Sequence, residues 1–255
     1  MRIAYSAALY GREYLAWAIR SVQDFVDEFF ILYTDRPSFG QGMHLPCPET
    51  EEELRLQAIR FLKKPLHWHK GIWGTEGEHR STIMRIAEQV GADLILSLDT
   101  DEVWDRETVE QQLDAAEKAP ARDTLVPFIH FWRSFNYVCS DPSMPVRIIK
   151  PGGSGIRYAD QKVPVLHFGY AQREEIIRYK IQIHGHRAEW RDDWLDSKFL
   201  AWKPGDLTRD VHPTCGWNTS FADYFWNVRP VDSTINAVVD RVMPDHPYRR
   251  LEIIR

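Results

Sequence analysis

The hydrophobic positions of the first hundred residues predict strands and helices in alternation. Continuous apolar runs at 2–6, 29–34 and 94–98 are typical of strands that are buried on both faces of a sheet. Between the first two runs, helical spacing is seen at Leu15, Ala18, Ile19, Val22, Phe25 and Val26. This βαβ opening predicts an α/β fold whose central sheet is mixed, mainly parallel and flanked by helices.

Capping residues mark further helices. The stretch TEEE has the form of a capping box, with Thr50 as N-cap and Glu53 as its partner, and predicts a helix over 51–62. A second amphipathic helix carries apolar residues from Ile83 to Val90 and ends at Gly91. The segment between them, 65–77, is predicted to be a loop.

The chain beyond residue 124 has strand-like stretches at 125–138, 146–150 and 162–170. A helix is expected at about 172–188, followed by a helical or loop-rich C-terminal extension with several prolines. We find no internal repeat and no low-complexity tract in the sequence.

Composition narrows the class of protein. The 255 residues are 44% hydrophobic, enough for a sizeable core, and the formal net charge of −5 gives no global attraction for nucleic acid. Three cysteines without CxxC spacing suit a reducing compartment. Because no stretch has the roughly 18 apolar residues of a membrane span, a cytoplasmic protein is expected.

The stretch LILSLDTDEVW places three carboxylates, Asp99, Asp101 and Glu102, directly after a strand. Carboxylates this close together repel one another, so they either spread into water or gather around a cation. Ligands of open α/β sheets bind at the carboxyl ends of the strands. An Asp-x-Asp at that position favours a site for Mg²⁺ or Mn²⁺, with open positions for the phosphates of a nucleotide.

Three segments resemble the GT-A-fold glycosyltransferases, particularly family 2. They are AYSAALYGREYLAWAIRSV, ILYTDRPS and EHRSTIMRIAEQVGADLILSLDTDEVW, and they cover roughly residues 2–104. The resemblance implies a nucleotide-sugar donor half at 1–104, and an acceptor half with the C-terminal extension at 105–255 of the same domain. It also implies a nucleotide site that includes Ser6, Ala7, Asp35, Arg80 and Asp99, and a metal held by Asp99 and Asp101.

The stretch VLHFGYAQREEIIRYK is similar to a segment of small family 2-like enzymes, which makes His167 the candidate third metal ligand. A hydrogen-bonded core histidine is the alternative. The HWH stretch at 67–69 and the HGH stretch at 184–186 are expected to be polar surface or loop segments, because neither has a further spaced set of ligands.

An inverting transfer needs a carboxylate base, and Asp160 and Asp193 are the candidates. A retaining transfer would remove this requirement, and the sequence does not decide the stereochemistry. The half that resembles the family less is expected to bind the acceptor, through Trp132, Arg133, Asn136 and Tyr137. Core packing is the alternative for any one tryptophan. The later tryptophans, with Arg173, Arg178, Lys180, Arg187 and Arg191, also keep a nucleic-acid acceptor open.

Together these features predict a metal-dependent glycosyltransferase, with Mn²⁺ or Mg²⁺ as cofactor and a UDP-sugar as the expected donor. The acceptor would be the hydroxyl of a glycan, a lipid-linked sugar or a modified nucleic-acid base. Two alternatives stay open. A sugar-phosphate nucleotidyltransferase would share the sheet and the carboxylates, although the glycine-rich activation loop is missing near the N-terminus. A non-catalytic sugar-binding or nucleic-acid-binding protein would bind ligand without turnover.

Overall fold

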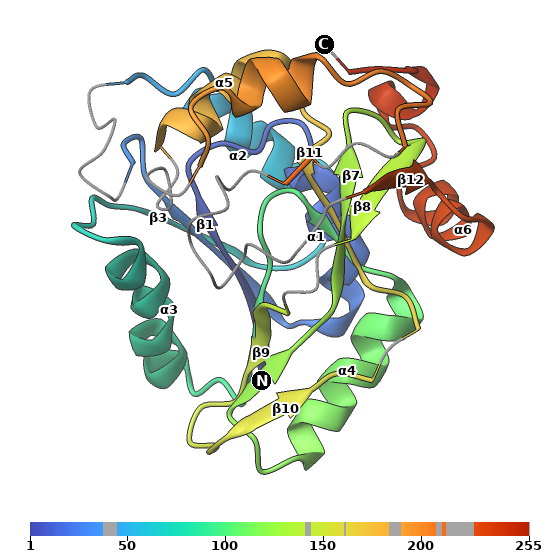
Figure 1. Ribbon diagram of the computed structural model, residues 1–255. Helices are drawn as coiled ribbons and strands as arrows, with labels where there is room; N and C mark the ends of the chain where they lie inside the picture. Colours follow the sequence, from blue (N-terminus) through green and yellow to red (C-terminus); the bar gives the residue numbers. More distant parts are fainter. Residues whose placement is uncertain are drawn as a thin grey trace.

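The computed structural model describes residues 1–37, 45–140, 144–160, 162–183, 190–207, 211–212 and 227–254. They form a mixed α/β fold with a seven-stranded and a five-stranded sheet (Figure 1). The central sheet is mostly parallel and is flanked by helices, which confirms the predicted fold class.

The seven-stranded sheet has the order β10-β6-β9-β4-β1-β2-β3. Four neighbouring strands are parallel: β1 (Arg2–Ala8), β2 (Glu28–Tyr33), β3 (Leu66–Lys70) and β4 (Leu94–Ser97). Strand β9 (Val146–Ile149) runs antiparallel to both β4 and β6 (Asp123–Leu125), and β10 (Ile156–Tyr158) is parallel to β6. The carboxyl ends of β1, β2 and β4 therefore meet at one edge.

Strand β3 corrects the prediction of a loop at 65–77. It pairs with β2 in parallel register from Phe29–Leu66 to Tyr33–Lys70. Because β3 ends the sheet, only one of its sides is hydrogen-bonded to a neighbouring strand, and polar residues are tolerated there. The imidazole of His67 stacks on Phe30, with ring centroids 4.5 Å apart, and bonds Glu28. A polar edge strand lacks the apolar run by which sequence analysis recognises strands.

Helices cover both faces of this sheet. Ile3, Tyr5 and Ile95 pack against Ile83 of α3 (Glu76–Val90) on one face. The alternate strand residues pack on the other face with helices α1 (Leu15–Val22), α2 (Glu51–Ile59) and α4 (Arg106–Lys118). The predicted capping box of Thr50 and Glu53 is confirmed, and Gly91 ends α3 at a φ of 67°.

The second sheet was not predicted as a separate unit. Its order is β12-β8-β7-β11-β5, with β12 (Val228–Pro230), β8 (Tyr137–Ser140), β7 (Phe128–Trp132), β11 (Val165–Tyr170) and β5 (Glu102–Val103). Residues from β5, β7, β8 and β11 share a core cluster with α1 and α6 (Ser233–Val242). Helix α5 (Glu174–Ile183) follows β11, and its Ile177 packs with Trp132 of β7.

Residue 104, the predicted limit of the donor half, lies between β5 and α4. Strands β6, β9 and β10 come from beyond this point and still join the sheet of β1 to β4. The two predicted halves thus share one sheet.

None of the helices in the described part of the chain is long and apolar enough to cross a membrane. Cys47 and Cys139 are free thiols. Cys215 and the HGH stretch at 184–186 lie outside the described residues.

Candidate active site

The acidic stretch connects the two sheets. Strand β4 ends at Ser97, and β5 begins at Glu102, so the intervening residues leave the first sheet and enter the second. There Glu102 pairs with His167 of β11, and the amide of Phe168 donates to the carbonyl of Asp101 at 2.8 Å. This pairing brings residues 101 and 167 together although 66 positions separate them in the sequence.

Asp99 is held by two arginines. Its carboxylate accepts from Arg147 Nη2 at 2.8 Å and from Arg80 Nη1 at 3.4 Å. Burial would raise the pKa of Asp99, but the charges of Arg147 and Arg80 outweigh it and lower the pKa to about 2. Arg80 of α3 therefore faces the acidic stretch, and its expected role at the nucleotide stays a prediction.

The Glu102 side chain neither extends into water nor is placed to bind a cation, the two arrangements expected for these carboxylates. It is fully buried and lies against Arg147. Arg147 Nε donates to Oε1 at 2.9 Å and to Oε2 at 2.8 Å. Burial raises the pKa of the Glu102 carboxyl, and Arg147 opposes that shift. One guanidinium thus bridges Asp99 and Glu102 and fixes the start of β5.

Asp101 faces the second sheet. Its Oδ2 accepts from Gln172 Nε2 at 2.8 Å, and its Oδ1 lies 3.5 Å from His167 Nε2. Only 5% of Asp101 is exposed. Burial raises the pKa of this carboxyl, and Lys180 opposes the rise. The two neighbouring aspartates of the Asp-x-Asp therefore have opposite pKa shifts.

His167 is oriented by a second histidine. His130 lies directly opposite it on the parallel strand β7, and the two Nδ1 atoms are 2.5 Å apart. Burial, followed by His130, Lys180 and Arg147, lowers the pKa of His167 well below its usual value, so the imidazole is neutral. When His167 Nδ1 carries the shared proton, its Nε2 lone pair is free toward Asp101, as a metal ligand requires.

The donor set suits a hard divalent cation in part. A carboxylate oxygen and a neutral imidazole nitrogen, 3.5 Å apart, could both reach one ion. Asp99 is engaged by arginines, and in the described residues no group of three His, Cys, Asp or Glu side chains is gathered to hold a metal. A cation here would have two protein donors and would need substrate oxygens and water for the rest.

The implied nucleotide residues surround the end of β1. Ser6 is buried, and its hydroxyl donates to the carbonyl of Leu98; Ala7 lies opposite Leu32 of β2. Asp35 follows β2, is exposed, and forms an ion pair with Lys70 at 3.0 Å. Since β1 lies between β2 and β4, Asp35 and Asp99 are on either side of it. The side chain of Ser6 supports the loop rather than facing solvent.

The two candidate bases lie apart from this cluster. Asp160 is exposed after the edge strand β10, and its backbone carbonyl accepts from Gln112. Asp193 is exposed before the π-helix Leu195–Leu200 and pairs with Arg191 at 2.9 Å, the first cause that lowers its pKa. The described contacts bring neither carboxylate to Asp101 or His167.

The implied acceptor residues fall into two groups. Trp132 is fully buried among Tyr170, Trp194 and Phe199, and Arg133 Nη1 donates to the carbonyls of Phe199, Leu200 and Trp202. Core packing, the alternative reading of the tryptophans, is confirmed for Trp132, Trp190, Trp194 and Trp202. Asn136 is exposed and Tyr137 is half-buried against Trp202, so these two retain surface for an acceptor.

Sequence reasoning missed His130, Arg147, Gln172 and Glu49. Glu49 accepts from the amides of Gly11 and Arg12 at 2.7 and 2.8 Å and fixes the loop after β1. The sequence does hold a signal for His130, as for His167: each is a polar residue that interrupts an apolar strand, in IHFW and LHFG. Arg147 has a similar signal within VRII.

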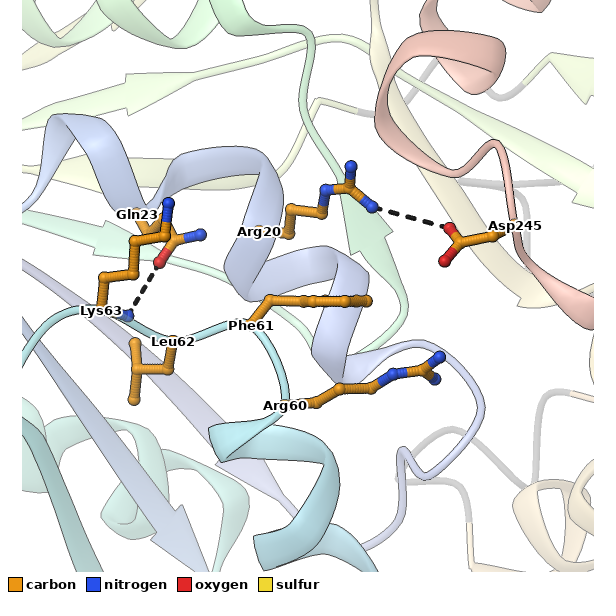
Figure 2. A pocket seen from close by; sticks show the side chains of 7 residues that line it. All are labelled: Arg20, Gln23, Arg60, Phe61, Leu62, Lys63 and Asp245. Carbon is orange, nitrogen blue, oxygen red and sulfur yellow. Dashed lines mark hydrogen bonds and ion pairs between the residues drawn. The ribbon is translucent and has the colours of Figure 1, made fainter.

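A separate pocket of about 580 Å³ lies on another part of the molecule. Figure 2 shows Phe61 between Arg20 and Arg60, with Arg20 directed toward Asp245 at 3.6 Å. Except for Asp245, which follows α6, its residues come from the segments that lead into β2 and β3, at the amino ends of the strands. It is therefore opposite the edge that carries the Asp-x-Asp.

No family model and no curated protein matches the chain. Among solved structures, residues 1–349 of S. aureus TarS are 14% identical, with a TM-score of 0.43 over 72% of this chain and 64% of that chain. 4-Diphosphocytidyl-2C-methyl-D-erythritol synthase is 13% identical, with a TM-score of 0.38 over 59% of this chain and 75% of that chain. UDP-glucose pyrophosphorylase is 14% identical, with a TM-score of 0.31 over 59% of this chain and 76% of that chain. Similarity at this level assigns no family to the chain.

Proposed function

We propose that this chain is a metal-dependent glycosyltransferase that moves a sugar from a nucleotide-sugar donor to an acceptor hydroxyl. A UDP-sugar is the expected donor. The observation that carries the proposal is the pair formed by Asp101 and His167 at the carboxyl end of β4. A buried carboxylate suits Mn²⁺ or Mg²⁺, and a neutral imidazole beside it favours the transition metal Mn²⁺ of the two. When bound, the ion would neutralise charge on a diphosphate leaving group.

The chain's own residues would divide the remaining work. Gln172 holds Asp101 in place, and His130, by accepting the Nδ1 proton of His167, would leave Nε2 of His167 unprotonated. Arg80 is about a third exposed beside Asp99 and can donate to the nucleotide from the other side of the site. Asp35 and Ala7 would line the far side of the donor pocket, across the end of β1.

A nucleotide-sugar screen tests the proposal. The wild-type protein, Asp101→Asn and Asp99→Asn are heated with a panel of nucleotide sugars, with Mn²⁺ or with EDTA. We expect one donor to raise the Tm of the wild type in Mn²⁺, since a ligand of the folded state stabilises it by mass action. Asp101→Asn should lose that shift while keeping its ligand-free Tm within a few degrees.

The reaction products separate the proposal from its alternatives. Incubation of the best donor with Mn²⁺ and water or an acceptor should release the nucleoside diphosphate. Release of pyrophosphate from a nucleoside triphosphate and a sugar phosphate would instead indicate a nucleotidyltransferase. Donor binding without any product would indicate a binding protein.

A further inference from the structure

Lys180 differs from the basic residues around it. On the same helix α5, Arg178 forms an ion pair with Glu174, and Arg173, just before the helix, forms one with Glu13. Lys180 is half-buried and forms no ion pair with any residue in the described part of the chain. A partly desolvated ammonium without a direct counter-ion is costly, so its position calls for an anionic partner.

The contacts of Lys180 place it at the candidate metal site. Its Nζ donates to the carbonyl of Gly169 at 3.3 Å and lies 5.0 Å from the centre of the Tyr170 ring. A Cβ at residue 169 would lie 2.7 Å from this Nζ and 2.6 Å from His167 Nε2. The ammonium and the imidazole nitrogen therefore border the same small space, which a glycine leaves empty.

The charges around this space favour an anion. Asp99 and Glu102 are matched by the guanidinium groups of Arg80 and Arg147. Asp101 is then left to balance Lys180 together with any divalent cation beside it. A dianionic ligand would restore neutrality and separate the two cations. Of the parts of a nucleotide sugar, only the diphosphate carries that charge.

We propose that Lys180 binds the diphosphate of the nucleotide sugar as a second cation beside the metal, at the β-phosphate, which is bonded to the sugar and leaves as part of the nucleoside diphosphate. This inference rests on the proposed function. It implies that nucleotide affinity has a metal-dependent part, held by Asp101 and His167, and a metal-independent part, held by Lys180. A charge-assisted hydrogen bond to a phosphate oxygen is strong enough for its loss to be measured.

The test is calorimetric binding of UDP and UMP to four proteins: the wild type, Lys180→Met, Lys180→Arg and, as the control on the exposed side of α5, Arg178→Met. Each is titrated in Mn²⁺ and in EDTA. We expect Lys180→Met to weaken UDP about tenfold in Mn²⁺ and to abolish the residual binding in EDTA, with a smaller effect on UMP. Lys180→Arg should restore most of the loss, and Arg178→Met should match the wild type.

Three results would overturn the inference. Unchanged UDP affinity in Lys180→Met would show that the ammonium does not meet the phosphates. Equal losses for UDP and UMP, or no recovery in Lys180→Arg, would assign the lysine to the fold or to another part of the nucleotide. If the wild type binds no nucleoside diphosphate from a panel of UDP, CDP, ADP, GDP and TDP, the proposed function itself fails, which is a different outcome from a selective failure of Lys180.

Discussion

The two sides of the acidic stretch are built differently, although Asp99 and Asp101 are only two residues apart. Asp99 belongs to the seven-stranded sheet through Arg147 of β9 and Arg80 of α3. Asp101 belongs to the five-stranded sheet through His167 of β11 and Gln172 beyond it. The two arginines lower the pKa of Asp99 in spite of its burial, whereas burial raises the pKa of Asp101. One carboxylate is neutralised by protein, and the other is left with a neutral imidazole.

The two aspartates of the Asp-x-Asp therefore have different partners and different electrostatic surroundings. On the Asp99 side the protein supplies the positive charge itself, which organises the turn into β5. On the Asp101 side, Lys180 and, more weakly, Arg147 act on the carboxylate through space and do not bond it. A cation or a ligand is therefore expected on the Asp101 side.

The largest loss of stability is expected when Arg147, which bonds both Asp99 and Glu102, is replaced. Arg147→Met leaves Glu102 buried without its partner, which should lower the free energy of unfolding by about 3 to 5 kcal/mol. Urea denaturation measures this loss. Arg122→Met, at an exposed ion pair, is the control and should change little. A loss below about 1 kcal/mol in Arg147→Met would mean that the buried bridge is not required.

Trp132→Ala tests the core packing of the five-stranded sheet, which holds Asp101 through His167. Because Trp132 is fully buried, its truncation should cost about 3 to 4 kcal/mol and reduce donor and acceptor use in parallel with the folded fraction. Urea denaturation and donor turnover, measured on the same samples, check this. Loss of acceptor turnover at normal stability would instead return Trp132 to the acceptor site.

Asp99 predicts a specific dependence of stability on pH. Its pKa is about 2 in the folded protein against 3.8 as the ordinary value, so the unfolded chain takes up the proton first as the pH falls. The stabilisation is therefore complete above about pH 4 and is lost toward pH 2, and amounts to about 2 kcal/mol. The difference in unfolding free energy between the wild type and Asp99→Asn should shrink over that interval. A constant difference would contradict the bridge to Arg147 and Arg80.

Asn136→Ala should have the smallest effect on the molecule as a whole. Asn136 is exposed, so we expect a change in stability within about 0.5 kcal/mol and unchanged UDP affinity. Acceptor turnover should fall, since a hydroxyl-bearing acceptor would lose a hydrogen-bond partner. Equal donor and acceptor kinetics in Asn136→Ala and the wild type would remove this residue from the acceptor site.

The sequence predicted β1, β2, β4 and β9 of the first sheet because these strands are mainly apolar runs, and its helices have clear caps, such as Thr50 with Glu53 and Gly91. It did not predict β10. It failed at β3, where edge position permits a polar strand. It also could not separate the second sheet, because the pairing of β5 with β11 joins segments that are far apart in the chain.

The site residues likewise divide into those that their own stretch of sequence predicts and those that depend on the pairing of distant segments. Asp101 and His167 were predicted from their own stretches, and the structure brings them together. The partners of Asp99 were not predicted. Arg80 was expected at the nucleotide, and Arg147 reaches Asp99 through the antiparallel pairing of β9 with β4. Such pairing depends on tertiary contacts that local residue patterns do not encode.

The most direct test is a Mn²⁺ titration followed by electron paramagnetic resonance, in the presence of UDP, for the wild type, Asp101→Asn, His167→Ala and Asp99→Asn. His67→Ala, at a half-buried histidine of the edge strand β3, is the control. We predict that Asp101→Asn and His167→Ala each weaken Mn²⁺ binding by about tenfold or more, that Asp99→Asn weakens it less, and that His67→Ala leaves it unchanged. Wild-type Mn²⁺ affinity in Asp101→Asn, or a loss confined to Asp99→Asn, would contradict a metal site built on the second sheet.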